Sequence, residues 1–243
     1  MARELKKQGI ESLVSQNVAG VEADDGVAKV SLEGGRALEA EKVFVAVGRK
    51  AVCDEETVKN LGLKMNGAAI AVNEKMETST SGVYAVGDAV GTTYLAHGAF
   101  AEAEVAAANA TGGDEKMGDY NLIPRAVYTF PEVASVGKNE AKCAEAGIET
   151  VVGRAMFRSN GRSVAHNENT GEVRVIRNKA TDEIMGVTMV GAAVTEMLAA
   201  ARALIGSTEK ITDVCFAHPT VSEVLKEAWE DAFGISLHVP PRK

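Results

Sequence analysis

The chain has 243 residues, of which 34 are acidic and 26 are basic, so its formal net charge is −8. Apolar residues make up 46% and charged residues 25%, which argues for a globular protein and against disorder, collagen or a disulfide-rich miniprotein. An acidic chain has no broad electrostatic reason to bind nucleic acid or an anionic membrane. The sequence contains no run of about 20 apolar residues, so we expect no transmembrane helix. Three distant cysteines, Cys53, Cys143 and Cys215, and a start without a signal-peptide core predict a reducing, cytoplasmic location.

The start of the chain predicts a short helix and a small sheet. Residues 4–9 resemble the last turns of a helix, with Gly9 as its C-cap. The runs Val27–Leu32 and 42–47, joined by a segment that opens at Glu33, predict a β-hairpin or two strands of a small meander. The second run is almost wholly apolar, which predicts a strand buried on both faces.

The next segment follows part of an α/β pattern. Residues 51–80 are expected to be irregular, with a short strand over 70–72. Residues 82–88 predict a buried strand that ends in a Gly-Asp turn. The alanine-rich stretch Ala96–Ala110 predicts a helix that is closed by Thr111-Gly112-Gly113. A strand followed by a helix is the unit of an α/β fold, of which only a remnant is present.

The pattern changes after a shift in composition near residues 114–121, which predicts a domain boundary. Strands gathered before helices indicate an α+β domain with an antiparallel sheet. The expected strands are 126–130, 133–137, 150–157, Glu172–Asn178 and 183–191, and the expected helices are 139–147, 192–205 and 221–233.

The sharpest chemical signal is the segment His218-Pro-Thr-Val-Ser-Glu223. Pro219 favours an extended conformation at His218, which holds the imidazole outside the helix that follows. A Glu223 carboxylate that accepts from one ring nitrogen would orient the ring, and the other nitrogen could then move protons at neutral pH. The same residues also fit a capping box from Thr220 to Glu223 beside an ordinary surface histidine. Both hypotheses can hold together.

Two weaker signals flank the predicted helix Ala96–Ala110. Asp88, next to Gly87, would place a carboxylate at the carboxyl end of a buried strand, where α/β folds bind ligands. A plain Gly-Asp turn is the alternative. The segment Tyr94-Leu-Ala-His97 enters the helix, whose first N–H groups are free to bind electron-rich ligand atoms. Simple packing at the helix start is the alternative for His97.

The sequence lacks the usual metal and phosphate fingerprints. Its four histidines and three cysteines show no metal-ligand spacing, so we expect no metal site. No Cys-x-x-Cys is present, and no Gly-x-Gly-x-x-Gly marks a dinucleotide phosphate loop.

Four segments together resemble the dihydrolipoamide dehydrogenases, which are pyridine nucleotide-disulfide oxidoreductases. They occur in family order over nearly the whole chain, and together they are highly specific. They are Val47-Gly48-Arg49, like the end of the family's NAD domain; 82–88 with Leu95-Ala-His97, like its second FAD-contacting segment; Tyr128-Thr-Phe-Pro-Glu-Val-Ala-Ser-Val-Gly137, like the opening of its dimerisation domain; and His218-Pro-Thr-Val-Ser-Glu223 with Leu225-Lys-Glu-Ala228, like its C-terminal active-site segment.

The resemblance implies a fold and a domain plan. Residues 1–50 would be the end of an NAD-binding domain, 51–121 the C-terminal segment of an FAD-binding domain, and 122–243 the dimerisation domain. The fold class is then an α/β remnant of FAD- and NAD-binding domains, followed by an α+β dimerisation domain with an antiparallel sheet. The chain would form a homodimer through residues 122–243.

The resemblance also implies the chemistry. His218 would be the acid/base that faces the redox disulfide of the other subunit, and Glu223 would orient it and stabilise its charge. The reaction would be oxidation of a dihydrolipoyl dithiol, with electrons passing through a cysteine pair and FAD to NAD. The residues implied in cofactor binding are Gly48 for NAD and Gly87, Asp88, Tyr94, Leu95, Ala96 and His97 for FAD, the last four through backbone groups.

The resemblance covers only the C-terminal part of the family. The family's FAD pyrophosphate loop and redox cysteine pair have no counterpart in this sequence, and its three cysteines lie outside any matching motif. We therefore expect a partial FAD site, a mostly missing NAD site and a chain that is redox-inactive on its own.

Alternative functions remain at this point. The chain could be a non-enzymatic dimerisation module or a fragment of a relative such as glutathione reductase. The tail has no cysteine pair, which argues against mercuric reductase and the large thioredoxin reductases. For the full-length family, the implied partners are lipoyl groups of a 2-oxoacid dehydrogenase or glycine cleavage complex.

Overall fold

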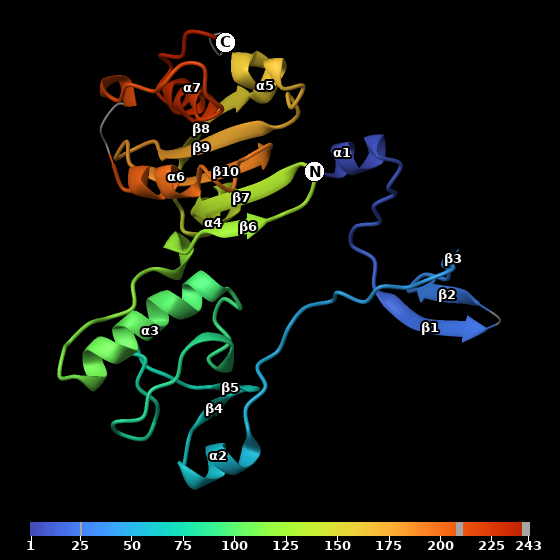
Figure 1. Ribbon diagram of the computed structural model, residues 1–243, viewed down its shortest axis with the longest axis vertical. Helices are drawn as coiled ribbons and strands as arrows, with labels where there is room; N and C mark the ends of the chain where they lie inside the picture. Colours follow the sequence, from blue (N-terminus) through green and yellow to red (C-terminus); the bar gives the residue numbers. More distant parts are fainter. Residues whose placement is uncertain (25, 208–210, 240–243) are drawn as a thin grey trace. The chain divides into compact units, whose positions relative to one another are not determined.

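The structure is a computed structural model that describes residues 1–24, 26–207 and 211–239 (Figure 1). Contacts divide the chain into two compact units, Met1–Lys50 and Ala51–Lys243, and each is described by itself. Within the described residues, every helix is too short or too polar to cross a membrane.

The first unit holds one short helix and a three-stranded antiparallel sheet. The helix α1 spans Ala2–Lys7, and the strands are β1 (Val18–Asp24), β2 (Val27–Leu32) and β3 (Ala37–Ala40). The sheet order is β1-β2-β3, with β2 antiparallel to both neighbours. The predicted strand Val27–Leu32 is therefore confirmed, but its predicted pairing with 42–47 is wrong, because its partners are β1 and β3, which the sequence did not predict.

The strand predicted over 42–47 is wrong. This segment is irregular, and the side chains of Phe44 and Val47 are each 92% exposed. Its apolar composition is that of a strand buried on both faces, but no strand pairs with it within the described part of the chain. Without a hydrogen-bonding neighbour, an apolar run has no sheet to join.

The second unit begins with short elements. The helix α2 spans Glu55–Asn60, and Asp54 caps it by accepting from the backbone N–H of Thr57 at 2.7 Å. A two-stranded ladder follows, made of β4 (Met65–Asn66) and β5 (Ala69–Ile70). The expectation of an irregular segment was wrong for α2, and the strand expected over 70–72 lies slightly earlier, in β5.

The buried strand predicted over 82–88 is also absent. Tyr84 makes a single bridge to Glu77, and the chain then enters the short 3-10 helix η1, Gly87–Ala89. Asp88 is exposed, and its neighbours are only partly buried. One bridge does not make a ladder, so an apolar run with strand propensity stays extended without becoming a strand.

The helix α3 spans Ala96–Ala110, as predicted. Alanine has the highest helix propensity, which explains a stable helix of this length with few large side chains. The helix ends where Gly112 takes a positive φ of 93° and the N–H of Gly113 donates to the carbonyl of Ala108 at 2.9 Å. Glycine adopts this left-handed conformation without a steric penalty.

The rest of the unit is built on a five-stranded antiparallel sheet, which confirms the predicted α+β pattern. Its order is β6-β7-β10-β9-β8. The strands are β6 (Arg125–Val127), β7 (Glu132–Gly137), β8 (Thr150–Met156), β9 (Glu172–Asn178) and β10 (Ile184–Gly191), and the helical segments are η2 (Tyr120–Leu122), α4 (Glu140–Glu145), η3 (Phe157–Ser159), α5 (Gly161–Ala165), α6 (Leu198–Leu204), η4 (Ile211–Asp213) and α7 (Glu223–Ala232).

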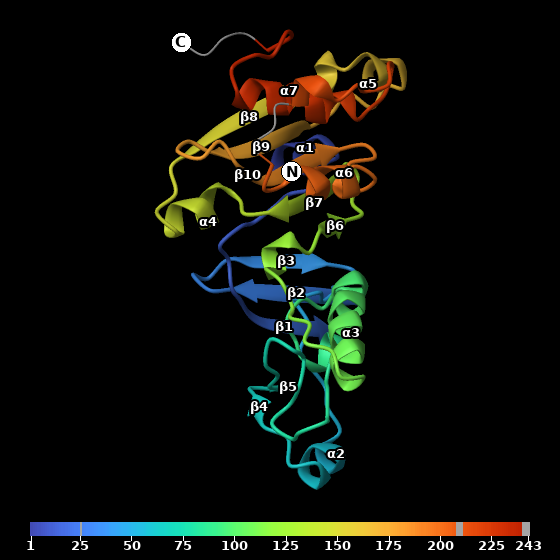
Figure 2. The ribbon, with the colours of Figure 1, turned by 90° about the vertical axis from the view of Figure 1, so that its left-hand side faces the viewer.

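Two helices cover this sheet and close its core. The helix α7 packs on β8 and β9, as both views show, and α6 packs on β7 and β10 (Figures 1 and 2). Phe157, Leu225 and Trp229 are among the largest fully buried side chains of this core. Because α7 is fixed along the sheet, the residues at its start and on its outer face have defined positions.

The predicted boundaries in this region differ in detail. Residues 192–197 form turns, so α6 begins later than expected, and the short helix α5 was not predicted. Asn160 caps α5 by accepting from the backbone N–H of Ser163 at 2.9 Å. The domain boundary expected near residues 114–121 stays a prediction.

Candidate functional site

His218 lies just before α7, and Glu223 is the first residue of that helix. The imidazole Nδ1 donates to Oε1 of Glu223 at 2.9 Å. The His218 side chain is 77% exposed and that of Glu223 is 26% exposed. The carboxylate therefore holds one ring nitrogen, while the ring remains open to an incoming group.

The capping box is present in part, and the expected hydrogen bond between His218 and Glu223 is present beside it. The second oxygen of Glu223, Oε2, accepts from the backbone N–H of Thr220 at 2.8 Å, which is one half of a capping box. The hydroxyl of Thr220 instead donates to the carbonyl of Ala217 and contacts the hydroxyl of Ser222. Glu223 thus closes the helix start and orients His218 at the same time.

Glu223 is held in its charged form. Burial by itself raises its pKa, but the backbone N–H of Thr220 and the ring of His218 outweigh burial and hold the pKa below its usual value. The adjacent ammonium of Lys226 acts in the same direction. An ionised carboxylate accepts from Nδ1 of His218, which leaves Nε2 to exchange a proton.

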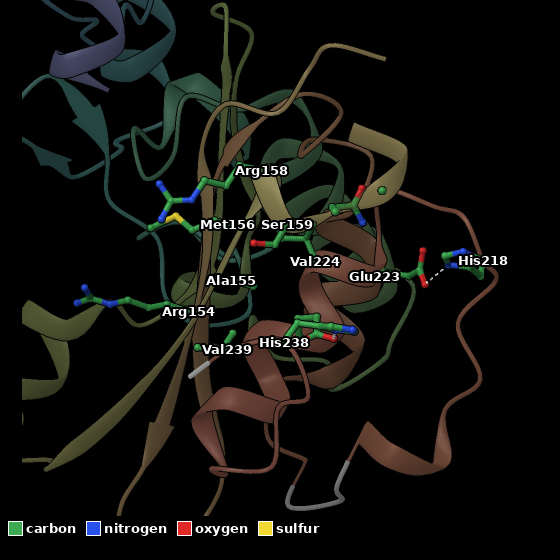
Figure 3. Close-up of a pocket in the computed structure, with 13 residues that line it drawn as sticks. Arg154, Ala155, Met156, Arg158, Ser159, His218, Glu223, Val224, His238 and Val239 are labelled. Atoms are coloured by element: carbon green, nitrogen blue, oxygen red, sulfur yellow. Dashed lines mark hydrogen bonds and ion pairs between the residues drawn. The ribbon is translucent and has the colours of Figure 1, made fainter. Parts of the chain in front are cut away.

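A cavity of about 400 Å³ opens beside this pair (Figure 3). Its wall combines the end of β8, the start of α5, the start of α7 and the tail of the chain. Its lining includes both charged and apolar side chains. The lining residues are Arg154, Ala155, Met156, Arg158, Ser159, Asn160, Gly161, His218, Glu223, Val224, Glu227, His238 and Val239.

A second histidine–glutamate pair lies in the same cavity. His238 Nδ1 donates to Oε1 of Glu227 at 2.5 Å, and the hydroxyl of Ser236 donates to Oε2 of Glu227 at 2.7 Å. The hydrogen bond to Glu227, followed by its negative charge, raises the pKa of His238. Glu227 lies one helical turn after Glu223, so α7 presents two carboxylate–imidazole pairs on one face.

The turn at Gly87 and Asp88 is fixed by a buried carboxylate. Glu102 of α3 is 1% exposed, and its Oε2 accepts from the backbone N–H of Gly87 at 2.6 Å. Its Oε1 accepts from the hydroxyl of Tyr120 at 2.9 Å. Burial, followed by the hydrogen bond to Glu102, raises the pKa of Tyr120 to about 12. This arrangement leaves the Asp88 side chain facing solvent at the start of a turn.

The segment from Tyr94 to His97 leads into α3. Tyr94 has a left-handed φ of 54°, and Leu95 is the extended N-cap residue. Helix geometry leaves the first N–H groups of α3, including those of Ala96 and His97, without acceptors in the helix. The ring of His97 is engaged elsewhere, because its Nε2 donates to the carbonyl of Pro124 at 2.6 Å. Its backbone, but not its ring, is therefore available to a ligand.

Gly48 belongs to the first unit. It has a positive φ of 129°, and no heavy atom lies within 4 Å of the position that a Cβ would take. Its backbone is thus unobstructed within that unit. The role expected for Gly48 at NAD stays a prediction.

The structure groups the predicted site residues into two sets within the second unit. His218 and Glu223 share one cavity at the β8 side of the five-stranded sheet, next to α7. Gly87, Asp88 and the start of α3 do not line that cavity. The contact of His97 with Pro124 instead ties them to the segment that enters β6, the opposite edge of the sheet.

The three cysteines are free thiols, and none of them belongs to the two sets of predicted site residues. Cys53, Cys143 and Cys215 are all free thiols, partly buried, buried and exposed respectively. The thiol of Cys53 lies 3.7 Å from the carbonyl oxygen of Ala89 at the end of η1. Over residues 1–24, 26–207 and 211–239, no group of three or more histidine, cysteine, aspartate or glutamate side chains could hold a metal ion.

Two family models match the chain, and they describe the same family. Residues 1–108 match pyridine nucleotide-disulphide oxidoreductase, and residues 123–229 match the pyridine nucleotide-disulphide oxidoreductase dimerisation domain. Together they account for most of the chain. The chain belongs to the pyridine nucleotide-disulphide oxidoreductase family.

Curated relatives in this family are dihydrolipoyl dehydrogenases and a leghemoglobin reductase. Dihydrolipoyl dehydrogenase 2 of Arabidopsis thaliana is 37% identical, over 98% of this chain and 48% of the relative. The human dihydrolipoyl dehydrogenase is 35% identical, over 97% and 48%. Leghemoglobin reductase of Glycine max is 37% identical, over 93% and 45%. The chain therefore spans about half the length of the curated relatives it matches.

Solved structures show the same fold. LpdA from Mycobacterium tuberculosis has a TM-score of 0.83 at 19% identity, over 94% of this chain and 50% of that chain. The HOCl-induced flavoprotein disulfide reductase RclA from Escherichia coli has a TM-score of 0.81 at 20% identity, over 96% and 53%. The expected fold class and the expected resemblance to a part of the dihydrolipoamide dehydrogenase family are confirmed.

Sequence reasoning did not find His238, Glu227, Glu102 or Tyr120. The spacing of Glu227 four residues after Glu223 was a usable signal, because it places both carboxylates on one helix face. The other three carried no local pattern, since their partners are brought together only by packing.

Proposed function

We propose that this chain is the C-terminal portion of a flavin disulfide oxidoreductase of the dihydrolipoyl dehydrogenase type, which oxidises dihydrolipoyl groups and passes electrons through a cysteine pair and FAD to NAD. The observation that carries this proposal is the His218–Glu223 pair at 2.9 Å in an open cavity, within a chain of this family. The lipoyl groups would belong to a 2-oxoacid dehydrogenase or glycine cleavage complex.

His218 is the proposed acid/base. With Nδ1 donating to ionised Glu223, the free Nε2 takes a proton from a substrate thiol and returns it to the departing thiol of the enzyme disulfide. Glu223 stabilises the imidazolium that forms, and it keeps the ring from rotating because its other oxygen is fixed by Thr220.

The chain also holds groups that suit part of a flavin site. Asp88 offers an exposed carboxylate to ribityl hydroxyls, on a turn that Glu102 fixes through Gly87. The first N–H groups of α3, from Ala96 onward, would donate to an acceptor-rich ring edge of the flavin. When bound, FAD supplies the electron transfer. We propose that Gly48 lies near NAD and that both cofactor sites are completed by residues outside this chain.

We propose a homodimer through residues 122–243. Three observations support it: the match to a dimerisation domain, the separation of the His218 cavity from the Asp88 turn, and exposed apolar side chains between β6 and β7. Tyr128 is 80% exposed and Phe130 is 78% exposed. In this proposed homodimer, His218 of one copy faces the flavin segment of the other.

The 243-residue chain on its own is proposed to be redox-inactive. Its three cysteines are all unpaired, and no two of them form a dithiol. Free thiols also suit the proposed cytoplasmic location, which is reducing. A non-enzymatic dimerisation module is the alternative function, and the exposed rings between β6 and β7 favour it.

The test combines this chain with the half of a dihydrolipoyl dehydrogenase relative that it does not span, in the same cells. The chain alone should be colourless and should not take up added FAD. The combined protein should be yellow and should reduce NAD with dihydrolipoamide.

Variants of the combined protein test the site. His218→Gln should lower turnover by roughly 10²–10⁴-fold, the range for a general acid/base, whereas His166→Gln, outside the cavity, should not. Turnover of the His218 variant within about a factor of two of the wild type would contradict the assignment. A combined dimer without flavin or activity would favour the dimerisation module.

A further inference from the structure

Glu102 is a buried carboxylate that has no part in the proposed proton transfer. It lies on α3 and is 1% exposed, although burying a charged group is unfavourable unless its oxygens are hydrogen-bonded. Both oxygens are in use: Oε2 accepts from the backbone N–H of Gly87 at 2.6 Å, and Oε1 accepts from the hydroxyl of Tyr120 at 2.9 Å. Buried ionic groups add little net stability and are better explained where they fix a particular geometry.

Glu102 fixes the start of the segment 87–92, which carries Asp88 and is called the Asp88 loop. Besides donating its N–H to Glu102, Gly87 has a positive φ of 70°, a conformation that favours glycine. A Cβ on Gly87 would lie 3.2 Å from the Cβ of Ala99, which is one turn before Glu102 on the same helix. The residue before Asp88 is therefore held close against α3.

The other end of the Asp88 loop is tied to the same carboxylate through Tyr120. The side chain of Thr92, the last residue of the loop, is hydrogen-bonded to the Tyr120 hydroxyl, which in turn donates to Glu102. Tyr120 lies in η2, the segment that leads into β6, so it reaches the loop from a distant part of the chain. One pair of side chains, Glu102 and Tyr120, therefore holds both ends of the loop.

The side chain of Asp88 is exposed, so these contacts fix the backbone that carries it. A loop that is fixed before binding loses less conformational freedom when a ligand arrives, and this difference strengthens the affinity. The free N–H groups at the start of α3 belong to the same helix as Glu102, so Glu102 also ties the Asp88 loop to this second group of the flavin segment.

We propose that Glu102 and Tyr120 are positioning residues for the flavin, which hold the Asp88 loop against α3 so that the Asp88 carboxylate meets the ribityl hydroxyls in a fixed orientation. This role rests on the proposed function, because it takes Asp88 as a residue that binds FAD. The two residues act through Asp88, so their loss weakens FAD binding only while Asp88 is present.

The first test measures the dissociation constant of FAD from the combined protein by flavin fluorescence. Glu102→Met keeps a similar volume but removes both acceptors, and it should weaken FAD binding about tenfold, as expected for the loss of one hydrogen bond to a charged group. Glu102→Gln still offers one oxygen to Gly87, and its FAD affinity should stay within about twofold of the wild type. Glu104→Met removes an exposed carboxylate from the same helix and should leave the FAD affinity unchanged.

A double-mutant cycle with Asp88→Ala separates positioning from a general loosening of the fold. Glu102→Met should weaken FAD binding by less than about twofold once Asp88 is replaced, because the carboxylate that it positions is gone. Equal losses in the two backgrounds would overturn the proposal, since a purely structural role acts whether or not Asp88 is present. Tyr120→Phe removes a single donor and should weaken FAD binding about threefold, and it takes the place of Glu102→Met in the cycle if that variant does not fold.

The hydrogen bond to Gly87 is tested in the 243-residue chain, which needs no flavin for this measurement. Amide hydrogen exchange at Gly87 should be about tenfold faster in Glu102→Met than in the wild type, and unchanged in Glu104→Met. Equal exchange rates in the two variants, or unchanged FAD affinity in Glu102→Met, would overturn the proposal and leave the proposed function intact. A wild-type combined protein that takes up no FAD would refute the proposed function and this role together.

Discussion

Gly153 of β8 sets how closely α7 approaches the sheet. It is buried, and a Cβ built on it would collide with the carbonyl oxygen of Ala228 and the backbone nitrogen of Ala232, and would lie 2.7 Å from the Cβ of Ala232. None of these atoms can rotate away, because they are backbone atoms or the first atom of a side chain. A methyl group at Gly153 therefore requires α7 itself to move.

The expected cost follows from this geometry. Overpacking a core costs about 1–3 kcal/mol, and a collision with backbone belongs at the upper end because no rotamer change relieves it. We expect Gly153→Ala to lower the free energy of unfolding by about 3 kcal/mol. With a urea slope of about 2 kcal/mol per molar, the midpoint should fall by about 1.5 M.

The assay is urea unfolding followed by circular dichroism, with Gly161→Ala as the matched control. Gly161 begins α5, and no heavy atom lies within 4 Å of its Cβ position, so alanine there should raise stability by about 0.5–1 kcal/mol. Because α7 carries Glu223, the ring resonances of His218 should also shift in the Gly153 variant alone. A Gly153 variant as stable as the wild type would refute this account of how α7 is positioned.

Two further predictions concern hydrogen bonds found only in the structure. Tyr120→Phe removes the donor to buried Glu102, so the free energy of unfolding should fall by about 1–3 kcal/mol in urea, and an unchanged midpoint would contradict this. Glu227 raises the pKa of His238 above its ordinary value of 6.5. The His238–Glu227 bond therefore stabilises the tail fully at pH values below 6.5, and this stabilisation is lost as the pH rises through the raised pKa. The backbone amide of Val239 should lose protection from hydrogen exchange over that pH range, and His238→Gln should remove this pH dependence. The same pH dependence in the wild type and the His238 variant would exclude the His238–Glu227 pair as its cause.

The sequence predicted some elements well and others poorly for identifiable reasons. The helix Ala96–Ala110 and the strand Glu172–Asn178 were predicted with correct ends. The alanine content that favours this helix is a local property of the sequence. The strands predicted over 42–47 and 82–88 are absent, although both runs are apolar. Strand formation needs a partner in space, and that partner is not a property of the run itself.

The candidate site divides in the same way. The His218–Glu223 pair was predicted because both residues belong to one short segment, and a proline and a helix start fix their geometry. The alternatives of capping and catalysis could not be separated from spacing. In the structure, Oε2 of Glu223 accepts from the backbone N–H of Thr220 and Oε1 accepts from His218.

The sequence by itself therefore determined the local chemistry of this protein: the acidic, globular composition, the alanine-rich helix, the antiparallel second half and the histidine–glutamate pair that carries the family resemblance. Only the tertiary structure decided which side chains share a cavity. Arg158 and His238 are far from His218 in the chain, and they reach its cavity because α7 packs on β8 and the tail folds back onto Glu227. Long-range packing depends on the whole core, so no short segment of sequence specifies it.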